Sequence, residues 1–214
     1  MPPLCSDDRR ELLALARAAI TEAVFHDRIP NLPVAEGRLA DPAGAFVTLY
    51  YRGRLRGCVG VSGRRQSLGE TVAQCVVSAA RNDSRFAAIG AGEVSEVEIE
   101  ISVLSELRVI SPGAIEAGTH GLLVIRGSHR GLLLPQVAVE RSWSAVRFLE
   151  ETCRKAGLEP DAWRHPETQV LAFTAEVFSE REFHRAAPSA AMHGPEREYA
   201  PSGGTTPEKT GPET

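Results

Sequence analysis

The sequence contains almost no lysine. Of its 24 lysines and arginines only Lys155 and Lys209 are lysine, and we attribute this preference for arginine to genomic base bias. The formal net charge of −4 argues against a general nucleic-acid-binding protein, because such proteins carry a surplus of basic residues. A local group of arginines could still hold a small anionic ligand; it consists of Arg52, Arg54, Arg56, Arg64 and Arg65.

Long apolar runs and paired cysteines are also missing. No run approaches the roughly 20 residues that a membrane-spanning helix requires. The N-terminal segment lacks the basic start and the apolar core of a signal peptide. The four cysteines lie far apart and form no C-x-x-C pair. We therefore expect a reduced, cytoplasmic protein with no membrane contact.

Familiar catalytic and metal-binding motifs are absent as well. The six histidines do not have the spacing of metal ligands, and no glycine motif for phosphate binding follows a strand. No Ser-His-Asp arrangement can be recognised. We therefore predict neither a bound metal nor a cofactor.

The composition of the chain changes near residue 186. Residues 186–214 contain no Val, Ile, Leu, Phe or Trp and are rich in Pro, Gly, Thr and Glu. Such a segment cannot bury enough apolar surface to offset the entropy lost on folding. We predict a disordered tail over residues 186–214 and one domain over residues 1–185.

Hydrophobic periodicity predicts an α+β domain. We expect helices over residues 6–25, 67–81 and 142–156, hairpins over 44–61 and 120–134, and strands over 97–103 and 169–178. The series of strand pair, helix and strand recurs with an offset of 74 or 75 residues, which indicates an internal duplication. The expected result is two similar lobes with a groove between them.

The most informative segment is 55–60, Leu-Arg-Gly-Cys-Val-Gly. Strand alternation places Cys58 on one face with Arg54 and Arg56. A nearby guanidinium favours the thiolate, so Cys58 is a candidate catalytic nucleophile. Two alternatives stay open, because Cys58 could be a small buried residue and because carboxylates of strand 97–103 could neutralise the arginines.

Two other segments supply candidate binding residues. Asp83 and Arg85 lie in a polar turn after the second helix, although a simple capped turn is the alternative. Pro135 is expected to end a strand and to hold the amide of Gln136 in place, where it could face the groove or form a structural hydrogen bond to the chain. The complete set of candidate binding residues is Arg56, Gly57, Gly60, Asp83, Arg85 and Gln136.

Several segments, taken in order, resemble the AMMECR domain family, whose prokaryotic members are called AmmeMemoRadiSam system protein A. They are residues 44–49, 55–60, 79–86, 101–104, 134–137 and 155–158, together with Trp163. The resemblance covers residues 8–183 and implies a duplicated fold around a barrel-like sheet. Ser84 stands where the family usually has proline, a change expected to leave Asp83 and Arg85 in place.

The resemblance also implies partners: a Memo-like protein, related to extradiol dioxygenases, and a radical S-adenosylmethionine protein. It implies no established reaction. We therefore expect an accessory or binding component of a modification system, which uses a groove around segment 55–60. The alternatives are a thiol-dependent enzyme with Cys58 as nucleophile and an RNA-binding module that uses Arg52, Arg54, Arg64 and Arg65.

Overall fold

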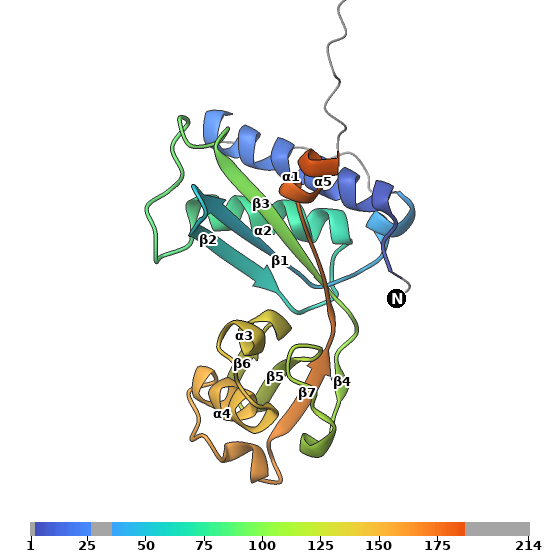
Figure 1. Ribbon diagram of the computed structural model, residues 1–214, viewed down its shortest axis with the longest axis vertical. Helices are drawn as coiled ribbons and strands as arrows, with labels where there is room; N and C mark the ends of the chain where they lie inside the picture. Colours follow the sequence, from blue (N-terminus) through green and yellow to red (C-terminus); the bar gives the residue numbers. More distant parts are fainter. Residues whose placement is uncertain (1–2, 27–35, 187–214) are drawn as a thin grey trace, which may run out of the picture.

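Two antiparallel four-stranded sheets form the framework of the computed structural model, which describes residues 3–26 and 36–186 (Figure 1). The first sheet has the order β2-β1-β3-β8 and contains β1 (Ala45–Tyr51), β2 (Arg54–Val61), β3 (Val97–Leu104) and β8 (Ala175–Ser179). The second has the order β4-β7-β5-β6 and contains β4 (Arg108–Val109), β5 (Gly121–Arg126), β6 (His129–Leu133) and β7 (Gln169–Phe173).

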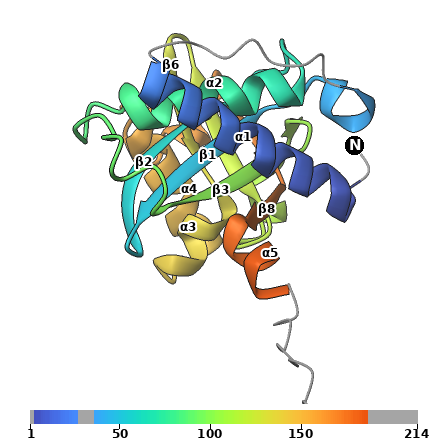
Figure 2. The same ribbon diagram turned by 90° about the horizontal axis from the view of Figure 1, so that it is seen from above.

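Helices cover the sheets. They are α1 (Ser6–His26), α2 (Leu68–Arg81), α3 (Pro135–Glu140), α4 (Ala145–Lys155) and α5 (Glu180–Ala186), with short 3-10 helices at Gly37–Ala40, Pro112–Ala114 and Ala162–Arg164. Figure 2 shows α1 and α2 side by side over the first sheet. The fold is thus α+β as predicted. The predicted tail lies outside the described residues except for Ala186, and no described helix is long and apolar enough to cross a membrane.

Helices α1 and α2 cover one face of the first sheet. Ser67 begins α2 with a capping box, because its side chain accepts the Glu70 N–H while the Glu70 carboxylate accepts the Ser67 N–H. The apolar face of α2 packs in the same core as Val47 and Leu49 of β1, which are fully buried. Side chains alternate along a strand, so the residues between them point to the opposite face, toward the second lobe (Figure 1).

A polar row crosses the face of the first sheet that the helices leave uncovered. Strand register places Thr48 of β1 opposite Cys58 of β2 and opposite Glu100 of β3. Residues directly opposite each other in antiparallel strands have their side chains on the same face. The backbone register therefore brings a thiol, a hydroxyl and a carboxyl group together on this face.

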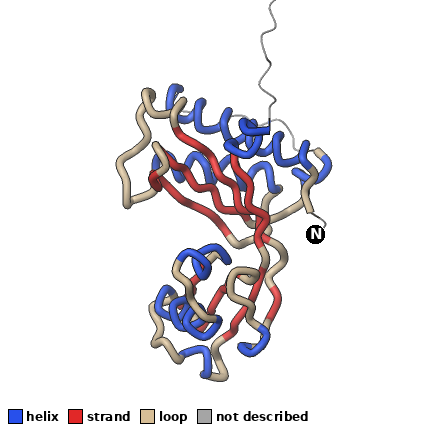
Figure 3. Tube along the Cα trace, viewed as in Figure 1, coloured by secondary structure: helices blue, strands red, loops and turns tan. Residues whose placement is uncertain are grey.

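Two chain crossings connect the lobes and show that the predicted barrel-like sheet was wrong. The segment expected as one strand over 169–178 is interrupted at Thr174, so that β7 belongs to the second sheet and β8 to the first. Figure 3 shows two stretches of chain running between the upper and the lower sheet. Where they meet, Ser105 N–H donates to the Thr174 carbonyl oxygen at 2.9 Å and Thr174 N–H donates to Ser105 Oγ at 2.9 Å. Because the strands change partners there, the strands of the described residues form two open sheets and not a closed barrel.

The two lobes share a local order of elements. In each, a hairpin is followed by a helix and by a third strand that pairs with the first strand of the hairpin. A side chain at Gly57 of β2 would overlap the Ala79 carbonyl of α2, and a side chain at Gly131 of β6 would overlap the Thr152 carbonyl of α4 and the backbone of Ala156 just after it. Helix and strand therefore approach equally closely in both lobes, while the duplication itself stays a prediction.

The second lobe differs from the sequence prediction in detail. Its hairpin turns through Gly127 and Ser128 alone, because β6 already begins at His129. Its helix begins later than expected, with Ser144 as N-cap. Gly157 has φ +74°, as expected for a glycine that ends a helix.

Candidate functional site

Two side chains of the loop after α2 hold the backbone of Cys58. Cys58 N–H donates to Asp83 Oδ2 at 2.8 Å, and Arg85 Nη2 donates to the Cys58 carbonyl oxygen at 3.2 Å. Arg85 also donates two hydrogen bonds to the Asp83 carboxylate, from Nε to Oδ1 at 2.9 Å and from Nη2 to Oδ2 at 2.7 Å. Because β2 is an edge strand, this pair satisfies backbone groups that a further strand would otherwise bind.

The hydrogen bonds of Asp83 and Arg85 to the Cys58 backbone form a clamp, and the attraction between these two charged side chains stabilises it. The side chain of Asp83 is only 6% exposed. Hydrogen bonding from Arg85 holds the pKa of Asp83 well below its usual range, and the bond from Cys58 N–H acts in the same direction. Arg85 N–H also donates to Asp83 Oδ1 at 3.2 Å, so serine at position 84 leaves the turn in place. Asp83 and Arg85, predicted as binding residues, thus form hydrogen bonds to the backbone of segment 55–60 itself.

The side chain of Cys58 lies between the two lobes. Thr48 Oγ1 donates to Cys58 Sγ at 3.4 Å. The guanidinium of Arg85 also interacts electrostatically with the Cys58 thiol. From the second lobe, Lys155 lies within electrostatic reach of Cys58 and of Arg85. Burial lowers the pKa of Lys155, Cys58 opposes that shift, and the positive charge of Arg85 adds to it. Cys58 itself is half-buried.

Sequence reasoning missed Thr48 and Lys155. Thr48 could have been found from the hairpin register, because a turn at Arg52 and Gly53 places it close to Cys58 across the strand pair. Lys155 carried a weaker signal, namely the near absence of lysine elsewhere in the chain. No local pattern could show that the end of α4 approaches β2 from the other lobe.

The predicted grouping of Cys58 with two guanidiniums was wrong. Gly57 pairs with Leu49 and Leu55 pairs with Tyr50, so Arg56 is the extra residue of a β-bulge. The bulge shifts the alternation by one residue, and Leu55 shares the face of Cys58. Leu55 is 42% exposed.

Arg56 ties the loop between α2 and β3 to the edge of the first sheet. Its Nε donates to Glu93 Oε1 at 2.9 Å and its Nη2 to Glu93 Oε2 at 3.0 Å. Its guanidinium also donates to the carbonyl oxygens of Ala87 and Ala88, at 2.6 and 3.2 Å. Hydrogen bonding from Arg56 lowers the pKa of Glu93. The donors of Arg56 are therefore engaged within the chain.

The candidate glycines allow close packing. Gly57 lies against the carbonyl of Ala79, as described above, and a side chain at Gly60 would overlap the ring of Phe46. Both glycines bring β2 against its neighbours, which is a structural reason for the glycines of the motif.

Gln136 belongs to a helix and links the two lobes. Pro135, expected to end a strand, instead occupies the first turn of α3, where its missing N–H costs nothing. Gln136 Nε2 donates to Ser102 Oγ of β3 at 3.5 Å, a long hydrogen bond. The amide thus lies on the uncovered face of the first sheet, two residues along β3 from Glu100.

Carboxylates of β3 interact with one another and with Tyr50 instead of with Arg56. Glu100 forms a hydrogen bond with Tyr50, and burial, followed by Glu98 and Glu140, raises the pKa of Glu100. Burial first, and then Glu100 and Glu140, raises the pKa of Tyr50 to about 12. The alternative that carboxylates of strand 97–103 neutralise Arg54 and Arg56 is wrong for Arg56, because its guanidinium binds Glu93 instead.

The comparisons with known proteins identify the family. The family model AMMECR1 matches residues 13–178 of this chain. The chain belongs to the AMMECR1 family. It is 41% identical to a protein of Methanothermobacter thermautotrophicus over 186 residues, which cover 83% of this chain and 97% of the relative. It is 40% identical to a protein of Aquifex aeolicus over 183 residues, which cover 82% and 94%.

A solved family structure has the same fold. An uncharacterised protein from Pyrococcus horikoshii aligns with a TM-score of 0.75 and 37% identity, covering 79% of this chain and 90% of its own. The recognition made from the sequence is confirmed. None of these three relatives carries a reaction in its description.

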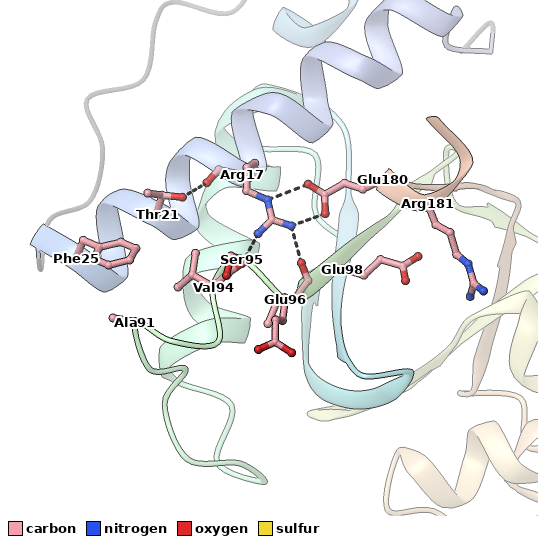
Figure 4. A pocket seen from close by; sticks show the side chains of 11 residues that line it. Arg17, Thr21, Phe25, Ala91, Val94, Ser95, Glu96, Glu98, Glu180 and Arg181 are labelled. Carbon is pink, nitrogen blue, oxygen red and sulfur yellow. Dashed lines mark hydrogen bonds and ion pairs between the residues drawn. The ribbon is translucent and has the colours of Figure 1, made fainter. Parts of the chain in front are cut away.

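Another cavity lies away from Cys58, and none of the candidate binding residues lines it. A space of about 760 Å³ opens between the end of α1, the loop before β3 and the start of α5 (Figure 4). Arg17 crosses it and donates to the Glu180 carboxylate and to the carbonyl oxygens of Val94 and Val97. Because these bonds occupy the guanidinium, we interpret Arg17 as a tie between α1, β3 and α5.

The remaining predictions on ligands concern metals and nucleic acid. Within residues 3–26 and 36–186, no group of three or more His, Cys, Asp or Glu side chains could hold a metal ion. Arg52 pairs with Glu96 at 3.1 Å, and Arg64 donates to the Pro42 carbonyl oxygen at 2.8 Å. The RNA-binding alternative stays a prediction with two of its four arginines bound to the chain itself.

Proposed function

We propose that this protein is a binding component of a modification system and that its partners are a Memo-like protein and a radical S-adenosylmethionine protein. One observation carries the proposal. Asp83 and Arg85 fix the backbone of Cys58 from outside the sheet, while the Cys58 side chain stays half-buried on the face toward the second lobe. A rigid backbone with a partly open side chain suits recognition, because little freedom is lost on binding.

The binding face consists of the polar row and the side chains that face it from the second lobe. Thr48 and Cys58 supply a hydroxyl and a thiol, and Gln136 supplies an amide. A small anionic ligand would meet Lys155 there, because the guanidinium groups of Arg56 and Arg85 are already bound within the chain. The expected ligand position is therefore beside Lys155.

Affinity capture with matched cysteine variants tests this function. The tagged protein is recovered from nuclease-treated lysate of its native host, and its companions are identified by mass spectrometry. We expect the wild type and Cys5→Ala, which changes an exposed cysteine, to capture a Memo-like or radical S-adenosylmethionine protein. Cys58→Ala and Lys155→Met should lose it.

The capture experiment has clear contrary outcomes. Equal recovery with Cys58→Ala would place the contact elsewhere, and capture of neither partner by the wild type would overturn the proposed partnership. Thermal unfolding of each variant separates loss of contact from loss of fold. An unrelated companion protein would not count in favour.

A thiol-dependent enzyme is the second candidate, and the position of Lys155 favours it. Lys155 lies within electrostatic reach of Cys58, and an amine in its neutral form can accept a proton from a nearby thiol. Lys155 would take the Cys58 proton, and the sulfur would attack an electrophilic carbon whose leaving group departs with its bonding electrons. Sequence reasoning alone found no general base for this chemistry.

A further inference from the structure

A small cavity lies between the lobes beside the polar row. It has a volume of about 270 Å³. Its walls come from the turn before β5, from α3 and from β8, and its lining residues are Gly118, Thr119, Pro135, Gln136, Val139, Glu140, Ala175 and Val177. Gln136 also carries the hydrogen bond to Ser102, so the cavity and the polar row share one wall.

The cavity is mainly apolar and is open. Val139 of α3 is 65% exposed and Val177 of β8 is 39% exposed, although both line the same space. Its volume lies below the roughly 300–1,000 Å³ typical of sites for drug-sized ligands and cofactors. The space therefore suits one long side chain better than a complete cofactor.

The wall formed by β8 has an unpaired edge. β8 is the last strand of the first sheet, and within the described residues no strand pairs with its outer side. An extended segment can add to such an edge and place alternate side chains on one face of the sheet. Ala175 and Val177 lie two residues apart, so they define the face on which a side chain of the added segment would enter the cavity.

The electrostatic surroundings favour a positive charge. Glu140 lines the cavity, and its negative charge raises the pKa of Glu100. The charges of Glu98 and Glu182 act on the pKa of Glu100 in the same direction. None of these four carboxylates forms an ion pair within the described residues. An ammonium or guanidinium group entering over Val139 and Val177 would therefore meet negative charge with no cation already bound to it.

We propose that the cavity between α3 and β8 receives a lysine or arginine side chain from an extended segment of a partner protein. The segment pairs with the edge of β8, the aliphatic part of its basic side chain lies on Val139 and Val177, and its charge reaches Glu140. This inference rests on the proposed binding function and names the chemistry that the partner presents.

Peptide titration tests the proposal directly. The probe is a hexapeptide of alternating valine and threonine with one central lysine. The matched control peptide has glutamate in place of the lysine. Backbone amide resonances of the full chain are followed by NMR. We expect the lysine peptide to shift resonances of residues 118–119, 136–140 and 175–177, and the glutamate peptide to shift none of them. Identical responses to both peptides, or responses only elsewhere, would overturn the proposal.

Two exposed positions provide variants that leave the core intact. Val139→Asp and Glu140→Arg should each reduce the response at least fivefold, whereas Glu167→Arg, which alters an exposed carboxylate outside the lining, should not change it. A response that Glu140→Arg leaves unchanged would contradict the role of charge.

The peptide and capture experiments fail independently. Peptide binding without capture of either predicted partner would leave the cavity proposal in place and overturn the partnership. Capture that persists in Glu140→Arg and Val139→Asp, together with no peptide response, would overturn the cavity proposal alone.

Discussion

The carboxylate of Asp83 accepts the backbone N–H of Cys58 at 2.8 Å, so a loop residue performs the task of a neighbouring strand. Arg85 completes the arrangement by donating to the carbonyl oxygen of Cys58. Both backbone groups of Cys58 at this sheet edge are thereby bound by side chains of one loop.

Replacing Asp83 with asparagine should destabilise the protein. The variant loses charge-assisted bonds from Arg85 and weakens the bond from Cys58 N–H, so we expect a loss of about 1–3 kcal/mol in the free energy of unfolding. Urea unfolding measures it. Asp161→Asn, at an exposed carboxylate without a cap hydrogen bond, is the control and should change little. Equal stability of both variants would show that the clamp contributes nothing.

The stabilisation by Asp83 should depend on pH. The pKa of Asp83 is lower in the folded protein than in the unfolded chain, so the unfolded state binds the proton more readily. The contribution is fully present above the unfolded pKa of about 4 and is lost as the pH falls toward the folded value. The stability difference between wild type and Asp83→Asn should shrink between pH 5 and pH 3, as assayed by urea unfolding. A difference independent of pH in this range would contradict this assignment.

Packing should make Gly57 and Gly60 sensitive to a single methyl group. Gly57→Ala places a side chain against the Ala79 carbonyl, and Gly60→Ala places one against the ring of Phe46. We expect each to cost about 1–3 kcal/mol of stability. Gly63→Ala is the matched control, since a side chain at Gly63 meets open space. Thermal unfolding of the three variants checks this, and a control that is equally destabilised would refute the packing argument.

Lys155 should influence the reactivity of Cys58. In a Cys5→Ser background, which removes the exposed cysteine, Lys155→Met should slow alkylation of Cys58 by iodoacetamide several-fold near pH 7.5. Mass spectrometry of the modified peptide gives the rate as a function of pH. Unchanged rates and an unchanged pH profile would remove Lys155 from the site and weaken the enzyme alternative.

Local patterns in the sequence predicted most of the elements but little of how the lobes meet. The capping residues at Ser67 and the alternation in β3 determine structure within a few residues, so these elements were found. The bulge at Arg56 and the interruption at Thr174 depend on which strands pair. The bulge made the predicted face of Cys58 wrong, and the interruption separates the predicted barrel into two sheets. Lys155 joins the site through the approach of two lobes, which leaves no local signature.

The most direct test of the account is calorimetric titration of the purified protein with the purified Memo-like protein of the same host. We predict saturable binding that Cys58→Ala weakens about tenfold or more and that Cys5→Ala leaves unchanged. No binding by the wild type, or equal affinity of all three proteins, would contradict the claim that the fixed Cys58 motif is a recognition surface.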